Sequence, residues 1–253
     1  MVVLEVADEL RPLVYASRRR GRADGLVVGP PDDPDATVGH VVQSVGVPLT
    51  EVGALRRGDG ERVDVSYRPA ANETVRVEPR ARPQPLELAR FVLDVHLGAL
   101  ARRLRLLGLD VAYRNDAADD ELLAQAIRES RVLLTRDRGL LCRRALPRGA
   151  YVRGQRPDEQ TRDVLDRFAP PLAPFTRCVA CGAELRAVPR EQVLDELEPG
   201  TRRTATRFTR CSGCGRVYWR GAHAERLDAL VATALAPSPG QPRPPQPPPP
   251  NRR

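Results

Sequence analysis

Two aspartates stand at matching places in the sequence and could bind a divalent cation together. Asp94 ends the apolar run of residues 91–93, and Asp137 comes two residues after the run Val132–Thr135. Each run is typical of a buried β-strand, and each precedes an amphipathic helical pattern. Ligands of open parallel α/β sheets bind outside the carboxyl ends of the strands. Because hard cations such as Mg²⁺ and Mn²⁺ prefer carboxylate oxygen, this pattern indicates metal-dependent phosphodiester chemistry.

Further acids follow two other predicted strands. They are Asp116, Asp119, Asp120, Glu121, Asp158 and Glu159. Asp94 and Asp137 could instead each cap the helix that follows, and Glu121 and its neighbours could complement the dipole at the start of a helix. Ser, Thr or Asn would cap as well, so acids after four successive strands are hard to ascribe to capping alone. We therefore favour a metal site.

Four of the five cysteines form two CxxC pairs, Cys178 with Cys181 and Cys211 with Cys214. Two such pairs can supply four thiolates to one tetrahedral Zn²⁺. We expect the zinc to be structural, because four cysteines leave no open coordination position. The 29 intervening residues predict a ribbon with an inserted hairpin or helix. The alternative is free or redox-active thiols, and Cys142 is expected to be a small core residue.

All 41 basic residues are Arg, and the formal net charge is +8. Arginine favours bidentate contacts with phosphate, so an anionic partner such as a nucleic acid is one reading of this charge, and a compositional bias that would give the same count is the other. Arg102, Arg103 and Arg105 are expected to project away from the apolar face of their helix. Arg102 and Arg103, together with Arg136 beside Asp137, are the candidate nucleic-acid contacts. The alternative for the helix is a solvated face.

The expected location is the cytoplasm. No apolar run approaches the ~18 residues of a membrane span. The N-terminus lacks the basic and then apolar pattern of a signal peptide. Paired cysteines fit metal binding in a reducing compartment better than a disulfide framework.

The elements that position these residues fall into several zones, the first of which is rich in Val. Residues 1–80 are expected to form a small mixed domain. Its strands are expected at 2–6, 26–28, 63–67 and 74–77, with a helix at 37–45. Residues 81–87, which include Pro83 and Pro85, are the expected linker.

From residue 88 the pattern alternates between strand and helix. Strands are expected at 88–93, 109–113, 131–135 and 150–153, and helices at 95–107, 119–129, 138–145 and 158–168. In the second helix, Leu122, Leu123, Ala126 and Ile127 are expected to face inward. Residues 88–170 should therefore form a parallel sheet with right-handed crossovers. Residues 171–235 are the expected zinc-ribbon module, ending in a helix at 224–235, and residues 236–253 a disordered Pro-rich tail.

Four blocks of this chain resemble the PIN-like ribonuclease family named for the C-terminal domain of the mut-seven exonuclease. In order, they are FVLDVHLGALARRLRLLGLDV, DDELLAQAI, RVLLTRDRGLL and the CxxC pairs with CGRVYWRGAH, over about residues 90–226. The resemblance implies a PIN-type sheet whose acids bind one or two divalent ions for RNA cleavage. By position it implies Asp94 as the first-strand acid and Asp137 as the acid of the TRD block. It implies either Asp119 or Asp120 as the acid of the second helix.

Residues 1–80 resemble the ubiquitin-like β-grasp domain that is often fused in front of this family. The resemblance rests on TVGHVVQSVGVPLTEVG followed by VDVSY. That domain is similar to sulfur carriers, but here it continues into a linker without a terminal Gly-Gly. We therefore expect a docking or regulatory role toward a protein partner rather than sulfur or protein transfer.

Taken together, the residues and the resemblance predict a metal-dependent ribonuclease that uses Mg²⁺ or Mn²⁺ for catalysis and Zn²⁺ for structure. The chief alternative is a non-catalytic RNA-binding or ribosome-associated adaptor that retains the fold. An aspartyl-phosphate phosphotransferase is disfavoured. That chemistry typically needs a second acid two residues past the nucleophile, where this chain has His96.

Overall fold

The computed structural model describes residues 2–18, 26–28, 35–84, 86–220 and 224–236. By the density of internal contacts the chain divides into two compact units, Met1–Glu184 and Leu185–Arg253, which we describe in turn. Beyond Ala236, the tail expected to be disordered lies outside the described residues. Every helix within the described ranges is too short or too polar to span a bilayer.

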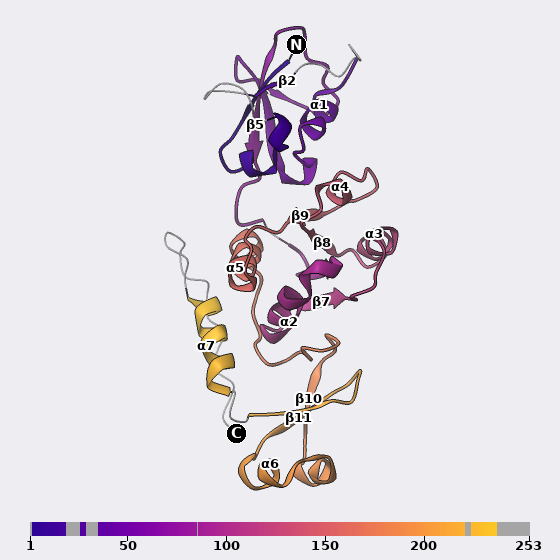
Figure 1. The fold of residues 1–253 in the computed structure, drawn as a ribbon, viewed down its shortest axis with the longest axis vertical. Helices are drawn as coiled ribbons and strands as arrows, with labels where there is room; N and C mark the ends of the chain where they lie inside the picture. The colour runs from indigo at the N-terminus through magenta and orange to yellow at the C-terminus, as the bar shows by residue number, and fades with distance from the viewer. Residues whose placement is uncertain (1, 19–25, 29–34, 85, 221–223, 237–253) are drawn as a thin grey trace. The chain divides into compact units, whose positions relative to one another are not determined.

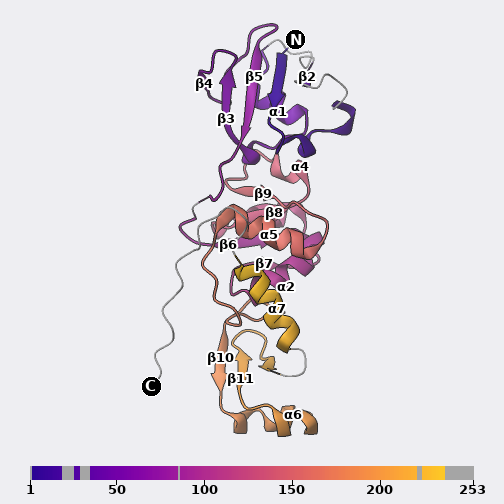
Figure 2. The ribbon, with the colours of Figure 1, turned by 90° about the vertical axis from the view of Figure 1, so that its left-hand side faces the viewer.

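The first unit begins with an N-terminal domain built on a mixed sheet, in the order β2-β1-β5-β3-β4 (Figures 1 and 2). Its elements are β1 (Val2–Val6), β2 (Leu26–Val28), α1 (Val38–Ser44), β3 (Val52–Arg57), β4 (Arg62–Val63) and β5 (Thr74–Pro79). Among the described strands of this domain, β1 and β5 pair in parallel and the other pairs are antiparallel. Alternate residues of β1, such as Leu4, are buried against Val38 and Val42 of α1. This is the predicted ubiquitin-like β-grasp arrangement.

Local side-chain chemistry sets several boundaries in this domain. Thr37 caps α1, since its hydroxyl accepts a hydrogen bond from the backbone N–H of His40 at 3.3 Å. Gly46 follows the helix with φ +99°, a conformation that glycine adopts without strain. The strand expected at 63–67 is wrong beyond Val63. The Asp64 carboxylate accepts a hydrogen bond from the backbone N–H of Ser66 at 2.9 Å, and this bond closes a turn.

The parallel-sheet domain follows, with strands in the order β7-β6-β8-β9. Its strands are β6 (Arg90–Leu93), β7 (Asp110–Tyr113), β8 (Val132–Thr135) and β9 (Gly149–Tyr151). Its helices are α2 (Gly98–Leu106), α3 (Asp119–Arg128), α4 (Arg138–Leu141) and α5 (Pro157–Phe168). All three strand pairs are parallel, as predicted. The chain places β7 on one side of β6 and then returns to place β8 on the other, so the strand order reverses between β6 and β8.

Helices cover both faces of this sheet. Phe91 and Leu93 of β6 pack on one face in the same cluster as residues of α2 and α5, while Val92 packs on the other face with residues of α3 and α4. The prediction that Ile127 faces inward is wrong, because its side chain is 48 % exposed. Ala126 faces the sheet, and the next residue along a helix is turned by about 100°.

A buried ion pair connects the N-terminal domain to the parallel-sheet domain within the first unit. One guanidinium nitrogen of Arg167, on α5, lies 2.7 Å and 2.8 Å from the two carboxylate oxygens of Glu51. Both side chains are about 2–3 % exposed. Burial lowers the pKa of Arg167, and the Glu51 carboxylate opposes that shift. Arg138 adds a second connection, since it donates to the carbonyl of Leu13 at 2.5 Å and stacks on the ring of Tyr15.

The second unit is a small antiparallel sheet with helical insertions. Its strands lie in the order β10-β11-β12, and its elements are β10 (Leu185–Val188), α6 (Pro199–Thr204), β11 (Phe208–Cys211), β12 (Val217–Trp219) and α7 (Ala224–Leu235). Two 3₁₀ turns, Arg190–Gln192 and Leu194–Glu196, precede α6. Val193, Leu197, Ala205 and Phe208 form the core of this insertion. The predicted inserted helix between the cysteine pairs is therefore present.

Candidate functional site

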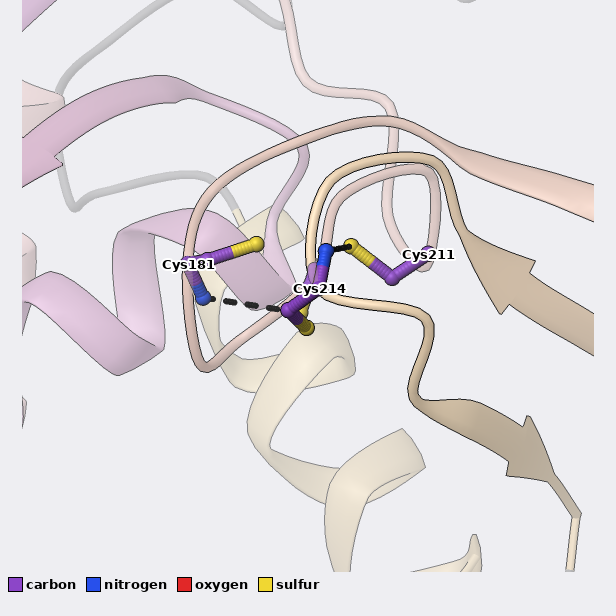
Figure 3. A group of neighbouring side chains, drawn as sticks. Cys181, Cys211 and Cys214 are labelled. Carbon is purple, nitrogen blue, oxygen red and sulfur yellow. Dashed lines mark hydrogen bonds between the residues drawn. The ribbon is translucent and has the colours of Figure 1, made fainter.

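The four paired cysteines lie together. Each can offer a sulfur atom, and the four sulfur atoms lie within 4.8 Å of one another. Figure 3 shows Cys181, Cys211 and Cys214 as neighbours at the tips of two loops. The backbone N–H groups of Gly213 and Cys214 each lie 3.3 Å from the sulfur of Cys211 and hold it in place. A tetrahedral Zn²⁺ with Zn–S bonds of about 2.3 Å needs sulfur atoms about 3.8 Å apart, so this donor set fits zinc.

Arg105 supports the loop that carries Cys178 and Cys181, a role that the sequence did not predict. We expected Arg105 to project away from the apolar face of α2, but its side chain is 2 % exposed. Its guanidinium donates to the carbonyl of Ala180 at 2.7 Å and to the carbonyl of Val111 at 3.0 Å. Burial lowers the pKa of Arg105, while negative charge on the sulfur atoms of Cys181 and Cys178 acts in the opposite direction. The buried arginine therefore ties the Cys178–Cys181 loop to β7.

Asp94 lies at the carboxyl end of β6 and is not a helix cap. The residue is 6 % exposed, and its side chain makes no capping hydrogen bond to the 3₁₀ turn that follows. One oxygen, Oδ2, accepts a hydrogen bond from the hydroxyl of Thr135 at 2.6 Å. The other oxygen, Oδ1, has no hydrogen-bond donor among the described residues. It is also not among the fully buried polar atoms without a partner, so part of its surface is accessible. A ligand can therefore reach this carboxylate.

Thr135 links Asp94 with Asp137. Its hydroxyl oxygen donates to Asp94 and accepts from the backbone N–H of Asp137 at 2.8 Å. Unlike Asp94, Asp137 does cap its helix: Oδ1 accepts from the backbone N–H groups of Gly139 at 2.6 Å and Leu140 at 3.3 Å. The two acids follow adjacent strands at the point where the strand order reverses, and that is where open α/β sheets bind ligands.

The acids of the α3 N-terminus are exposed. Asp120 lies 3.2 Å from Arg143, and Asp119 has no side-chain partner among the described residues. Within those residues, the four cysteines are the only group of three or more potential ligands whose ligand atoms all lie within 4.8 Å. The structure thus joins Asp94 to Asp137 through Thr135, and does not gather Asp119 or Asp120 with them into such a group.

The acids after β9 have local partners. Asp158 pairs with Arg103. Glu159 accepts from the backbone N–H groups of Gln155 and Arg156 at the start of α5, and these bonds lower the pKa of Glu159 to about 2. Asp158 is thus held by an ion pair with α2, and Glu159 by the start of its own helix.

The three candidate arginines have different surroundings. Arg102 is exposed and makes no side-chain hydrogen bond or ion pair with the described residues. Arg103 is engaged by Asp158. Arg136, beside Asp137, donates to the side-chain carbonyl of Gln155 at 3.1 Å. Arg102 is therefore the candidate whose guanidinium is most available to a phosphate.

Two family models match this chain. The model described as Mut7-C RNAse domain matches residues 89–231, and the model described as Mut7-C ubiquitin matches residues 1–85. Searches among curated proteins and among solved structures return no match. The two matched segments follow one another in the order that the sequence blocks predict.

Proposed function

This chain belongs to the Mut7-C RNAse domain family, and on that premise we propose that it hydrolyses RNA phosphodiester bonds with a divalent ion held at the carboxyl ends of β6 and β8. The observation that carries the proposal is the environment of Asp94. It is a buried carboxylate at the reversal of strand order, it caps no helix, and it keeps one oxygen open to a ligand.

Asp94 and Asp137 are the proposed ligands of the catalytic ion. The chemistry of the donors fits Mg²⁺ or Mn²⁺, because each carboxylate has an oxygen without a hydrogen-bond donor among the described residues. When bound, such an ion supplies a Lewis acid that activates water and neutralises charge on the phosphate. Asp119 or Asp120, at the start of α3, would complete the site through side-chain movement, for which their exposure leaves room.

Thr135 is the proposed positioning residue. Its single hydroxyl hydrogen is donated to Asp94, so the Asp94 carboxylate cannot rotate freely. The same oxygen receives the N–H of Asp137 and fixes the start of the loop that carries the second acid. A site held this way keeps its two carboxylates near one geometry before a metal or substrate arrives.

Arg102 and Arg136 are the proposed RNA contacts of this domain. Arg102 offers a guanidinium that has no partner among the described residues, and Arg136 stands next to Asp137. Arg103 is a weaker candidate, because contact with phosphate would have to replace its ion pair with Asp158. The cysteine module is proposed to help position RNA, with single-stranded regions as the expected target.

The test is cleavage of mixed structured and unstructured RNA by the purified protein with Mn²⁺, Mg²⁺ or EDTA. Asp94→Asn keeps the shape of the side chain and its contact with Thr135 but removes the charge. We expect a loss of about 10²–10³-fold in metal-dependent cleavage, typical of removing one essential electrostatic group. Asp8→Asn, an exposed acid of the N-terminal domain, is the matched control and should leave cleavage unchanged.

RNA binding measured in EDTA separates catalysis from the adaptor alternative. The nuclease proposal expects Asp94→Asn to bind RNA at least as tightly as the parent, because an acidic charge is lost. If the parent protein binds RNA and cleaves none of the substrates with either metal, the adaptor replaces the nuclease. Full cleavage by Asp94→Asn would show that the catalytic site lies elsewhere.

A further inference from the structure

A cavity of about 420 Å³ lies in the first unit, beside the segment that joins the N-terminal domain to the parallel-sheet domain. Its charged lining residues are Glu9, Glu51, Arg80, Arg82, Arg153 and Arg167. Asp94, Thr135 and Asp137 do not line it, so it is separate from the proposed catalytic site. Its volume falls in the range of small-molecule pockets, roughly 300–1,000 Å³.

Positive charge exceeds negative charge in this cavity. Glu51 is neutralised by Arg167, and Arg82 is paired with Asp163 at 2.7 Å. Arg80 donates only to the carbonyl of Thr50, at 2.8 Å, and forms no ion pair among the described residues.

Arg153 has still fewer contacts. Its guanidinium makes neither a hydrogen bond nor an ion pair within the described part of the chain. Glu9 is the single lining carboxylate there without an ion pair, so the lining holds two guanidinium groups and one carboxylate that form no ion pair among the described residues.

Two of the lining residues carry a buried hydrogen-bond donor that lacks an acceptor among the described residues. Among the described residues, three buried side-chain polar atoms lack a partner, and two of them, Nε of Arg167 and one terminal nitrogen of Arg82, belong to residues that line the cavity. Arg167 is 2 % exposed. Leaving a charged donor buried and unpaired is costly, so such groups normally find an oxygen ligand or water.

We propose that this cavity binds a small phosphate-bearing anion of up to mononucleotide size. Guanidinium groups match phosphate oxygens through paired N–H donors, and phosphate carries enough charge for more than one of them. Arg80 and Arg153 would contact the anion, with Arg82 and Arg167 behind them. The lining comes from both domains and from residues 80–84, so the bound anion would hold the two domains together.

Isothermal titration of the full-length protein tests this proposal, with inorganic phosphate, pyrophosphate and adenosine 5′-monophosphate as separate probes. Arg153→Gln removes the unpaired charge and disturbs no described side-chain contact. We expect it to weaken binding at least tenfold. Arg148→Gln is the matched control, because Arg148 is also an arginine without a described side-chain partner, and it does not line the cavity. Arg80→Gln is a second variant that should weaken binding in the same direction.

The three probes distinguish the sources of the anion. Equal binding of all three would identify the phosphate group as the ligand, and preferred binding of the monophosphate would identify a nucleotide. Absence of binding by all three probes overturns the proposal. So does binding that Arg153→Gln and Arg80→Gln leave unchanged, or equal binding of malonate, a dicarboxylate of similar charge. None of these outcomes depends on RNA cleavage.

Discussion

The cysteine group and the strand-end aspartates are two sets of metal-binding side chains that this chain assembles in different ways. Each cysteine pair comes from one short loop, and the four sulfur atoms lie within 4.8 Å of one another. The aspartates come from strands that are separated in sequence by a helix, a strand and another helix, and adjacent only in the sheet. Asp137 also caps a helix, whereas Asp94 is held by Thr135.

The two sets differ in whether local sequence or tertiary structure determines the positions of their ligand atoms. CxxC spacing places two ligands by local backbone geometry, so each half of the zinc group is encoded within four residues. The position of the acidic pair depends on the order of the strands and on Thr135, which hydrogen-bonds to both aspartates. We therefore expect that substitution of one of the four cysteines removes the zinc and unfolds the cysteine module together. The acidic pair should lose activity with little loss of stability.

The largest effect is expected from Cys178→Ser. The sulfur of Cys178 is fully buried, and its loss removes one of four zinc ligands. The zinc content measured by elemental analysis should fall from about one Zn per chain toward zero. The cysteine module should unfold as well, because metal binding supplies folding free energy. Cys142→Ser, at the cysteine outside the group, should retain the zinc. A module that stays folded without metal would contradict the expectation.

Arg105→Met comes second and concerns the support of the first cysteine loop. The carbonyls of Val111 and Ala180 would lose their buried donor, which should lower the free energy of unfolding by about 2–4 kcal/mol. Arg102→Met, at an exposed neighbour on the same helix, should change stability by less than about 0.5 kcal/mol. Chemical denaturation measures both. Equal stabilities would mean that Arg105 is not needed to hold the loop.

Thr135→Val should have an intermediate effect, and mainly on catalysis. The substitution keeps the volume but removes the hydroxyl that joins the two acids. We expect cleavage to fall about 10–100-fold, on the scale of a lost positioning contact. Thr135→Ser, which keeps the hydroxyl, should recover most of the rate. If both variants cleave alike, the hydroxyl does not position Asp94.

The smallest effect on stability is expected at Asp137, and it should separate the two roles of this residue. Asp137→Ala loses the helix cap and should destabilise the protein by about 1 kcal/mol, whereas Asp137→Asn keeps a capping oxygen and should be nearly neutral. Both should lose metal-dependent cleavage. Thermal unfolding and cleavage of the same samples give the comparison. A fully active Asp137→Asn variant would leave capping as the only role of this residue.

The alternation of strands and helices was sufficient to predict the parallel-sheet domain, and CxxC spacing was sufficient to predict the cysteine group. Strand β3 was missed for a physical reason. A register shift between Val52 and Ala54 breaks the alternation of buried and exposed side chains by which strands are recognised. The predicted positions of Asp94 and Asp137 at strand ends agree with the structure, but their roles as metal ligands stay predictions.

Contacts between distant segments could not be predicted from the pattern. Arg105 occupies a polar position of its helix, yet it is buried because carbonyls of a remote loop surround its guanidinium. Glu51 and Arg167 are likewise ordinary charged residues in the sequence, and their burial depends on the packing of the two domains. Such side chains carry information that only the tertiary structure supplies.

The Glu51–Arg167 pair also has an evolutionary consequence. A gene that lost either domain would leave a charge adapted to burial without its counterion, and removing one member of a buried pair typically costs about 3–5 kcal/mol. Fusion of the two domains therefore becomes difficult to reverse once this pair is in place. Substitutions at positions 51 and 167 should covary among descendants, as matched charges or as two apolar residues, in lineages that keep both domains.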